Sequence, residues 1–146
     1  MTIQDILSRK GTVIYHVTPA NTVYEAIEKM AEYNVGALVV LDGDRLCGIV
    51  SERDYRNKII LKGRASRETK VSEIMTDRVI CLGPQHSVDH GLNIMTQKKI
   101  RHLPVLDDSQ KLVGVVSIGD LVKATIEQKN LEIENLKGYI FGGYPG

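Results

Sequence analysis

The chain has 146 residues, of which 19 are Lys or Arg and 18 are Asp or Glu, so its formal net charge at pH 7 is +1. A charge this close to zero argues against general electrostatic attraction to nucleic acids or membrane surfaces. Two cysteines are too few for the disulfide framework of a small secreted domain, and no run of about 18 apolar residues predicts a membrane span. The N-terminus lacks a signal-peptide pattern, so we expect a cytoplasmic protein with neither nucleic-acid nor membrane partners.

The first half of the chain predicts a short strand, a helix, two strands and a second helix. Residues 13–17 are typical of a strand, which Thr18-Pro19 ends. Thr22 then begins a Thr-x-x-Glu capping box, and the apolar spacing after it predicts an amphipathic helix as far as Tyr33. The elements expected next are strands at 36–41 and 45–50, joined by Asp42-Gly43-Asp44, and a helix at 53–61.

The second half repeats the first. Val88 corresponds to Val23 at an offset of 88 − 23 = 65, and Gly114 corresponds to Gly48 at an offset of 114 − 48 = 66. The sequence therefore predicts an α+β fold of two βαββα units. Units of about 60 residues bury their sheets poorly alone, so we expect them to pack with pseudo-two-fold symmetry.

The expected organisation has four parts. They are an N-terminal segment with the first repeat at 1–61, a linker with a short helix (71–75) at 62–76, the second repeat at 77–126, and a helical extension and tail at 127–146. Strands at 103–106 and 111–116 and a helix at 120–137 complete the second repeat and its extension.

One motif occurs in both repeats, as Gly48-Ile-Val-Ser51-Glu-Arg-Asp54 and as Gly114-Val-Val-Ser117-Ile-Gly-Asp120. Glycine, two β-branched residues and Ser-x-x-Asp predict a strand that runs directly into a helix N-terminus. The free N–H groups and the dipole of such a terminus favour anions, so two similar pockets are indicated. The alternative is that both serines are plain N-caps, with the aspartates favouring the helix dipole.

With its repeat and duplicated motif, the chain resembles a tandem cystathionine-β-synthase (CBS) domain pair, often called a Bateman module. Further landmarks of that resemblance are Thr22-Val-x-x-Ala26, Ser87-Val-x-x-Gly91, Asn34-Val-Gly-Ala-Leu-Val-Val40, Ile100-Arg-His-Leu-Pro-Val105 and Ile74-Met75-Thr76. The closing stretch, Asn135 to Tyr144, is similar to the tail of small stand-alone CBS-pair proteins of bacteria and mitochondria, and the absence of a transit-like segment favours a bacterial protein.

The resemblance implies an adenine-nucleotide site in the cleft between the repeats, where the motif aspartate meets the ribose and the serine meets phosphate or ribose. Arg53 adds a phosphate-pairing cation to the first motif, whereas the second has Gly119 at that position. Arg101 and His102 open a strand toward the same cleft, where the first repeat has Gly36 and Ala37, although a solvated Arg101 and a core-edge His102 remain the alternative.

We therefore expect one shared, asymmetric cleft with the second motif as the preferred ribose site. If the His102 cation contacts phosphate, affinity should fall as pH rises. The candidate nucleotide-binding residues are Gly36, Ala37, Ser51, Arg53, Asp54, Arg101, His102, Ser117 and Asp120.

The sequence shows no pattern of catalysis, such as a nucleophile with its base or a Gly-rich phosphate loop, and the spacing of His16, His86 and His90 indicates no zinc site. The expected function is a non-catalytic sensor of AMP, or of ADP, ATP or NAD(H), that forms a homodimer and signals to an effector protein in trans. The alternatives are a dimeric scaffold with an empty cleft and an S-adenosylmethionine-binding module.

Overall fold

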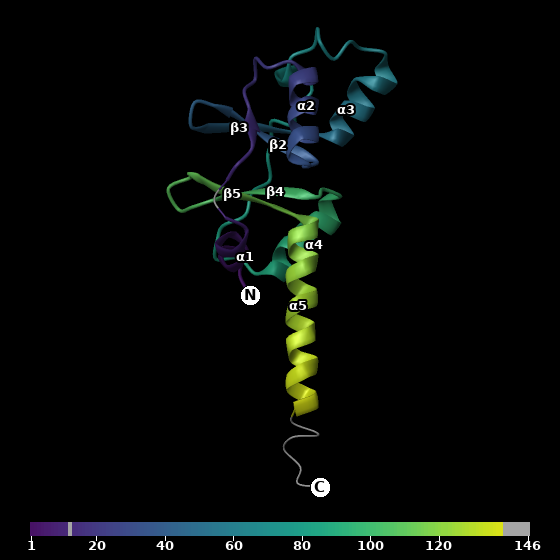
Figure 1. Ribbon diagram of the computed structural model, residues 1–146. Helices are drawn as coiled ribbons and strands as arrows, with labels where there is room; N and C mark the ends of the chain where they lie inside the picture. The colour runs from purple at the N-terminus through teal and green to yellow at the C-terminus, as the bar shows by residue number, and fades with distance from the viewer. Residues whose placement is uncertain (12, 139–146) are drawn as a thin grey trace.

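The computed structural model describes residues 1–11 and 13–138, which form two similar halves stacked on each other, with a long helix projecting from one of them (Figure 1). The helices of the fold are α1 (Ile3–Lys10), α2 (Val23–Tyr33), α3 (Glu52–Lys58), α4 (Val88–Lys98) and α5 (Ile118–Lys137), with single 3-10 turns η1 (Ile60–Lys62) and η2 (Val71–Glu73). The strands are β1 (His16–Val17), β2 (Ala37–Asp42), β3 (Arg45–Ser51), β4 (His102–Leu106) and β5 (Leu112–Ser117).

The two sheets repeat one arrangement, which confirms the predicted mixed α/β fold with two repeats. In the first half, β2 pairs antiparallel with β3 and places Ala37 opposite Ser51. In the second half, β4 pairs antiparallel with β5 and places His102 opposite Ser117. Each half therefore presents the start of one strand beside the serine that ends the next.

The predicted first strands are shorter than expected. In the first half, β1 keeps two residues, which pair in parallel with β2, and Val13 is 70% exposed. In the second half the strand is reduced to an isolated parallel bridge between Leu82 and Val105. Pro84 explains the early end, because its ring fixes φ and it has no N–H to continue a ladder.

The helix starts agree with the predicted capping chemistry. The Thr22 side chain accepts from the backbone N–H of Glu25 while Glu25 reaches back to Thr22, so the predicted capping box is confirmed. Reciprocal boxes also begin α3 at Ser51 and α5 at Ser117. A further box, Thr2 with Asp5, begins α1, a helix that the sequence did not predict. Helix α3 ends at Lys58, earlier than expected, and the predicted short helix is the 3-10 turn η2.

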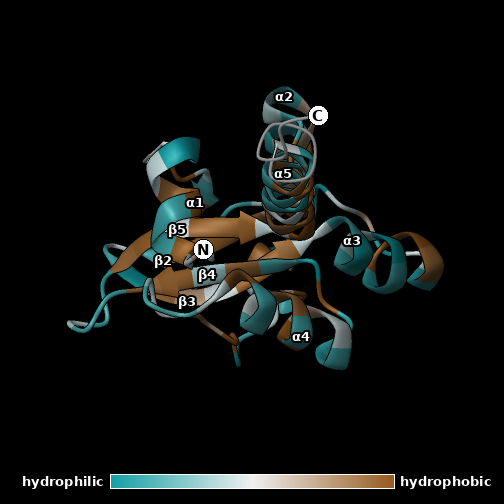
Figure 2. Cartoon of the chain, turned by 90° about the horizontal axis from the view of Figure 1, so that it is seen from below, coloured by the Kyte–Doolittle hydropathy of each residue, from teal (hydrophilic) through white to brown (hydrophobic). Residues whose placement is uncertain are grey.

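Each half has its own apolar core, and each core is completed by the segment that precedes the other repeat. Ile3, Ile6 and Leu7 of α1 pack in the core of the second half, although the N-terminal segment was expected with the first repeat. Val71 and Ile74 pack in the core of the first half. In Figure 2, hydrophobic strands lie in the middle of the molecule with helices around them.

This exchange explains the glycines that open the two motifs. A Cβ on Gly114 would lie 2.5 Å from Cδ2 of Leu7, and a Cβ on Gly48 would lie 2.5 Å from the sulfur of Met75. Each of these strands is therefore in close contact with the segment that precedes the other repeat. Glycine, which has no side chain, leaves room for this contact in the strand that leads into the helix.

Helix α5 is the longest element and continues well beyond the second half (Figure 1). Only its first turns contribute buried residues, namely Leu121 and Ala124. The predicted tail residues Tyr139, Ile140 and Phe141 lie outside the described residues. Among the helices described, none has both the length and the hydropathy needed to cross a membrane.

Candidate functional site

A cavity of about 840 Å³ opens where the two halves meet. The start of β2, the end of β3 and the first turn of α3 line it from the first half, and residues 99–102 line it from the second. Thr76 and residues 78–80 of the connecting segment complete the wall. Seven of the nine predicted site residues lie in this wall, namely Gly36, Ala37, Ser51, Arg53, Asp54, Arg101 and His102.

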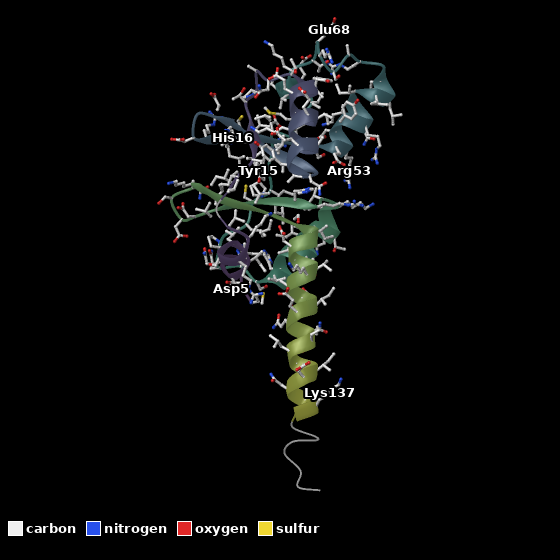
Figure 3. All side chains as sticks on the ribbon, in the orientation of Figure 1. Asp5, Tyr15, His16, Arg53, Glu68 and Lys137 are labelled. Carbon is white, nitrogen blue, oxygen red and sulfur yellow. The ribbon has the colours of Figure 1, made fainter. Side chains whose placement is uncertain are left out.

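Arg53 connects the two halves across the cavity. Its Nη1 donates a 2.6 Å hydrogen bond to the carbonyl oxygen of Lys99, and Figure 3 shows Arg53 at the level where the halves meet. Lys99 adopts φ = 55° at the end of α4, a left-handed conformation that turns the chain toward β4. The guanidinium therefore lies at the cavity wall, and its hydrogen bond to Lys99 depends on how the two halves are placed relative to each other.

Asp54 and Ser51 form the capping pair that the alternative reading predicted. Asp54 Oδ2 accepts from the Ser51 backbone N–H at 2.9 Å, and the Asp54 N–H donates to Ser51 Oγ at 3.3 Å. The other carboxylate oxygen lies 3.0 Å from Lys58 Nζ. The Asp54 carboxylate is thus held in place at the edge of the cavity by its own helix.

His102 stands over Gly36, on the opposite wall. A Cβ on Gly36 would lie 3.3 Å from Cε1 of His102, so the glycine leaves room for the imidazole ring. Burial lowers the pKa of His102 below its usual value, and the positive charges of Lys10 and Arg101 lower it further, against the opposing charge of Asp120. A lowered pKa disfavours the imidazolium form, so the expected contact of a His102 cation with phosphate has to overcome this burial.

The second motif does not line this cavity, so the expected ribose site at Ser117 and Asp120 stays a prediction. Lys10, at the end of α1, donates to Asp120 Oδ2 at 2.7 Å and to the Val115 carbonyl at 2.9 Å. Burial raises the pKa of Asp120, but hydrogen bonds from Lys10 and Ser117 outweigh it and hold that pKa below its usual value. Asp120 is therefore already paired, and no pattern in the sequence pointed to Lys10.

Three further cations in the cavity wall were missed from the sequence. Arg56 lies one turn after Arg53 on α3, a spacing that would have indicated it. Arg78 follows Thr76, which is fixed to β3 by reciprocal backbone hydrogen bonds with Ile49 of 2.9 and 3.0 Å. Lys99 is the C-cap residue of helix α4.

The charges that line the cavity are strongly unbalanced. Five cationic residues and two acidic residues, Glu52 and Asp54, line it, so the excess without His102 is 5 − 2 = 3 positive charges. The cationic residues are Arg53, Arg56, Arg78, Lys99 and Arg101. Such a wall attracts an anion that carries more than one negative charge.

Comparisons with known proteins agree on one family. The family model for the CBS domain matches residues 3–60 and 71–127. A mitochondrial CBS domain-containing protein of Arabidopsis thaliana, CBSX3, is 41% identical over 98% of this chain and 73% of its own length. A solved structure of a protein with CBS domains from Burkholderia ambifaria is 48% identical, with a TM-score of 0.84 over 87% of this chain and 95% of the other.

Among the solved relatives is a CBS domain pair with adenosyl ligands bound. The CBS domain pair of protein MJ0100, in complex with 5′-methylthioadenosine and S-adenosyl-L-methionine, is 25% identical, with a TM-score of 0.76 over 86% of this chain and 99% of the other. In that protein, the ligands share an adenosyl group.

Proposed function

Because the chain belongs to the CBS domain family, we propose that it is a non-catalytic regulatory module that binds a phosphate-bearing adenine nucleotide in the cavity between its halves. The excess of three positive charges in the cavity wall carries this proposal. The volume of about 840 Å³ lies within the range of about 300–1,000 Å³ typical of small-molecule sites. AMP is the simplest ligand that meets these conditions, with ADP, ATP and NAD(H) as larger candidates.

The charge also distinguishes between adenosyl ligands. Methylthioadenosine is neutral, and S-adenosylmethionine carries a sulfonium cation. Neither ligand therefore has a phosphate to form ion pairs with the five cationic residues. A phosphate between Arg53 and Arg101 forms charge-assisted hydrogen bonds with both halves at once. We therefore expect AMP to bind more tightly than S-adenosylmethionine, the alternative suggested by MJ0100.

The ribose belongs with the first motif in this proposal. Asp54 lines the cavity, and an ionised carboxylate accepts hydrogen bonds from a vicinal diol. Both aspartates have a lysine partner, but Asp120, unlike Asp54, does not line the cavity. One nucleotide per chain is expected.

Occupancy would be transmitted through the contact between the halves. Arg53 donates a hydrogen bond to the Lys99 carbonyl across the cavity. A phosphate that binds the Arg53 guanidinium therefore competes with this hydrogen bond between the halves. A ligand shifts such an equilibrium only by its difference in affinity for the two states. We expect the shifted geometry to be read by an effector protein in trans and the chain to act as a cytoplasmic homodimer.

A thermal-shift panel with AMP, ATP, NADH and S-adenosylmethionine tests the proposal. At 100 times its dissociation constant, a ligand that binds only the folded state adds about 2.7 kcal/mol, or about 5–11 °C for a chain of this size. Arg101→Ala should reduce the AMP shift strongly. Arg45→Ala, at the far end of β3, is the matched control and should leave it unchanged. No shift with any ligand would favour the scaffold reading, and a shift with S-adenosylmethionine alone would refute the charge argument.

A further inference from the structure

The exposed face of α5 repeats apolar residues at coiled-coil spacing. Five large apolar side chains fall within an arc of about 80° on a helix of 3.6 residues per turn and extend over about 27 Å. They are between 37% and 60% exposed, namely Ile118, Val122, Ile126, Ile133 and Leu136. The buried residues of α5, Leu121 and Ala124, face away from this arc, so the stripe is not the face that holds α5 to the second half.

The spacing matches a heptad register. Ile126 and Ile133 take a positions, and Val122, Lys129 and Leu136 take d positions. In a parallel coiled coil, β-branched residues at a with leucine at d favour an assembly of two helices. Figure 3 shows Lys137 at the end of a helix that has left the body of the protein, so the stripe lies open along the projecting part.

The charges that flank the stripe select a parallel partner. Glu132 occupies a g position and Lys137 the following e position, so a second copy in parallel register brings Glu132 beside the partner's Lys137. An antiparallel arrangement of the same segment would place Lys123 beside the partner's Lys137 instead. Glu132 is 58% exposed and has a 3.5 Å contact with Lys129 of its own helix, which leaves its carboxylate accessible.

Lys129 is the one polar residue in the seam. A lysine at a core position weakens a coiled coil but limits the registers in which it forms. Its side chain is 68% exposed, and its long aliphatic stem allows the ammonium group to reach solvent beside Glu132. The seam is therefore built for a specific, moderate association.

We infer that two copies of this chain associate through a parallel, in-register coiled coil of their α5 helices, with Ile126, Ile133 and Leu136 in the seam. This dimer surface is independent of the nucleotide cavity, which lies at the other end of the second half. It gives the expected homodimer a defined interface and orientation, with both bodies at the same end of the coiled coil.

Sedimentation equilibrium of the full chain measures the dissociation constant of the dimer. Ile133→Asp should raise the dimer dissociation constant at least tenfold. Leu131→Asp is the matched control, because Leu131 is 62% exposed but about half a turn away from the stripe, and it should change little. Lys129→Leu should lower the constant several-fold. Thermal unfolding and AMP titration of each variant establish that the fold and the cavity remain intact.

Cysteine cross-linking is the test of orientation. Ile133→Cys should form an intermolecular disulfide rapidly on oxidation, because equivalent a positions approach closely in a parallel dimer, whereas Leu131→Cys should not. A wild-type chain that is monomeric at 100 times the concentration used for ligand binding would overturn the inference. So would a dimer that is equally stable in Ile133→Asp and Leu131→Asp, or cross-linking no faster at 133 than at 131. None of these results would bear on the nucleotide cavity.

Discussion

Replacing Gly114 by alanine should destabilise the protein through the contact between β5 and α1. The new Cβ would lie 2.5 Å from Cδ2 and 3.2 Å from Cδ1 of Leu7, against an optimum of about 3.5–4.0 Å between carbon atoms. Leu7 is only 7% exposed, so its side chain has little room to move away. Overpacking of this kind costs about 1–3 kcal/mol. The free energy of unfolding, measured with urea, should fall by that amount.

Two further variants make this prediction specific. Gly119→Ala meets only the Ser117 Oγ at 3.6 Å, inside a helix, so it should be neutral or stabilise by up to about 1 kcal/mol. Leu7→Ala alone should cost about 2–5 kcal/mol. In the Leu7→Ala, Gly114→Ala double variant the clash is gone, so its cost should be less than the sum of the two. Strict additivity, or a neutral Gly114→Ala, would refute the close crossing of β5 by α1.

Two predictions concern the second motif and the cavity wall. Lys10→Met should lower the free energy of unfolding by up to about 1 kcal/mol, because it removes the partly exposed ion pair with Asp120. Arg9→Met removes a more exposed ion pair on the same helix and should cost less. Equal losses in the two variants would contradict the special role of Lys10. His102 has a folded-state pKa below its unfolded value, so it contributes stability above pH 6.5 that is lost as pH falls toward the folded pKa. The free energy of unfolding in urea should therefore decline less steeply from pH 7 to 5 in His102→Asn than in the wild type. The difference in slope should be no more than about 1.4 kcal/mol per pH unit. An unchanged slope would show that the His102 ring is not buried in its neutral form.

The repeat made most of the fold predictable from the sequence. The strand pairs and the helix after each motif follow from local signals such as the Thr22 capping box and the Asp42-Gly43-Asp44 turn. The helix α1 was missed, because its stability comes from packing Ile3, Ile6 and Leu7 into the core of the second half rather than from a long periodic pattern. Contacts between segments so distant in sequence leave no local trace.

The candidate site was predictable where the motif determined it and unpredictable where packing did. Arg53, Asp54 and Arg101 line the cavity as the resemblance implied. The pairing of Asp120 was not predictable, since both motifs share the Ser-x-x-Asp pattern and only the folded position of α1 brings Lys10 to the second one. The ion pair between Lys10 of α1 and Asp120 thus makes the two motifs unequal.

The location of bound AMP is the most direct test of a nucleotide site at the first motif, and backbone amide chemical shifts on titration of the full chain measure it. We expect the largest changes at cavity residues such as Ala37, Asp54 and His102, and saturation at one AMP per chain. Amides of Ser117 and Asp120 should move less. Changes centred on Ser117 and Asp120, or no change in either motif, would contradict a nucleotide site at the first motif.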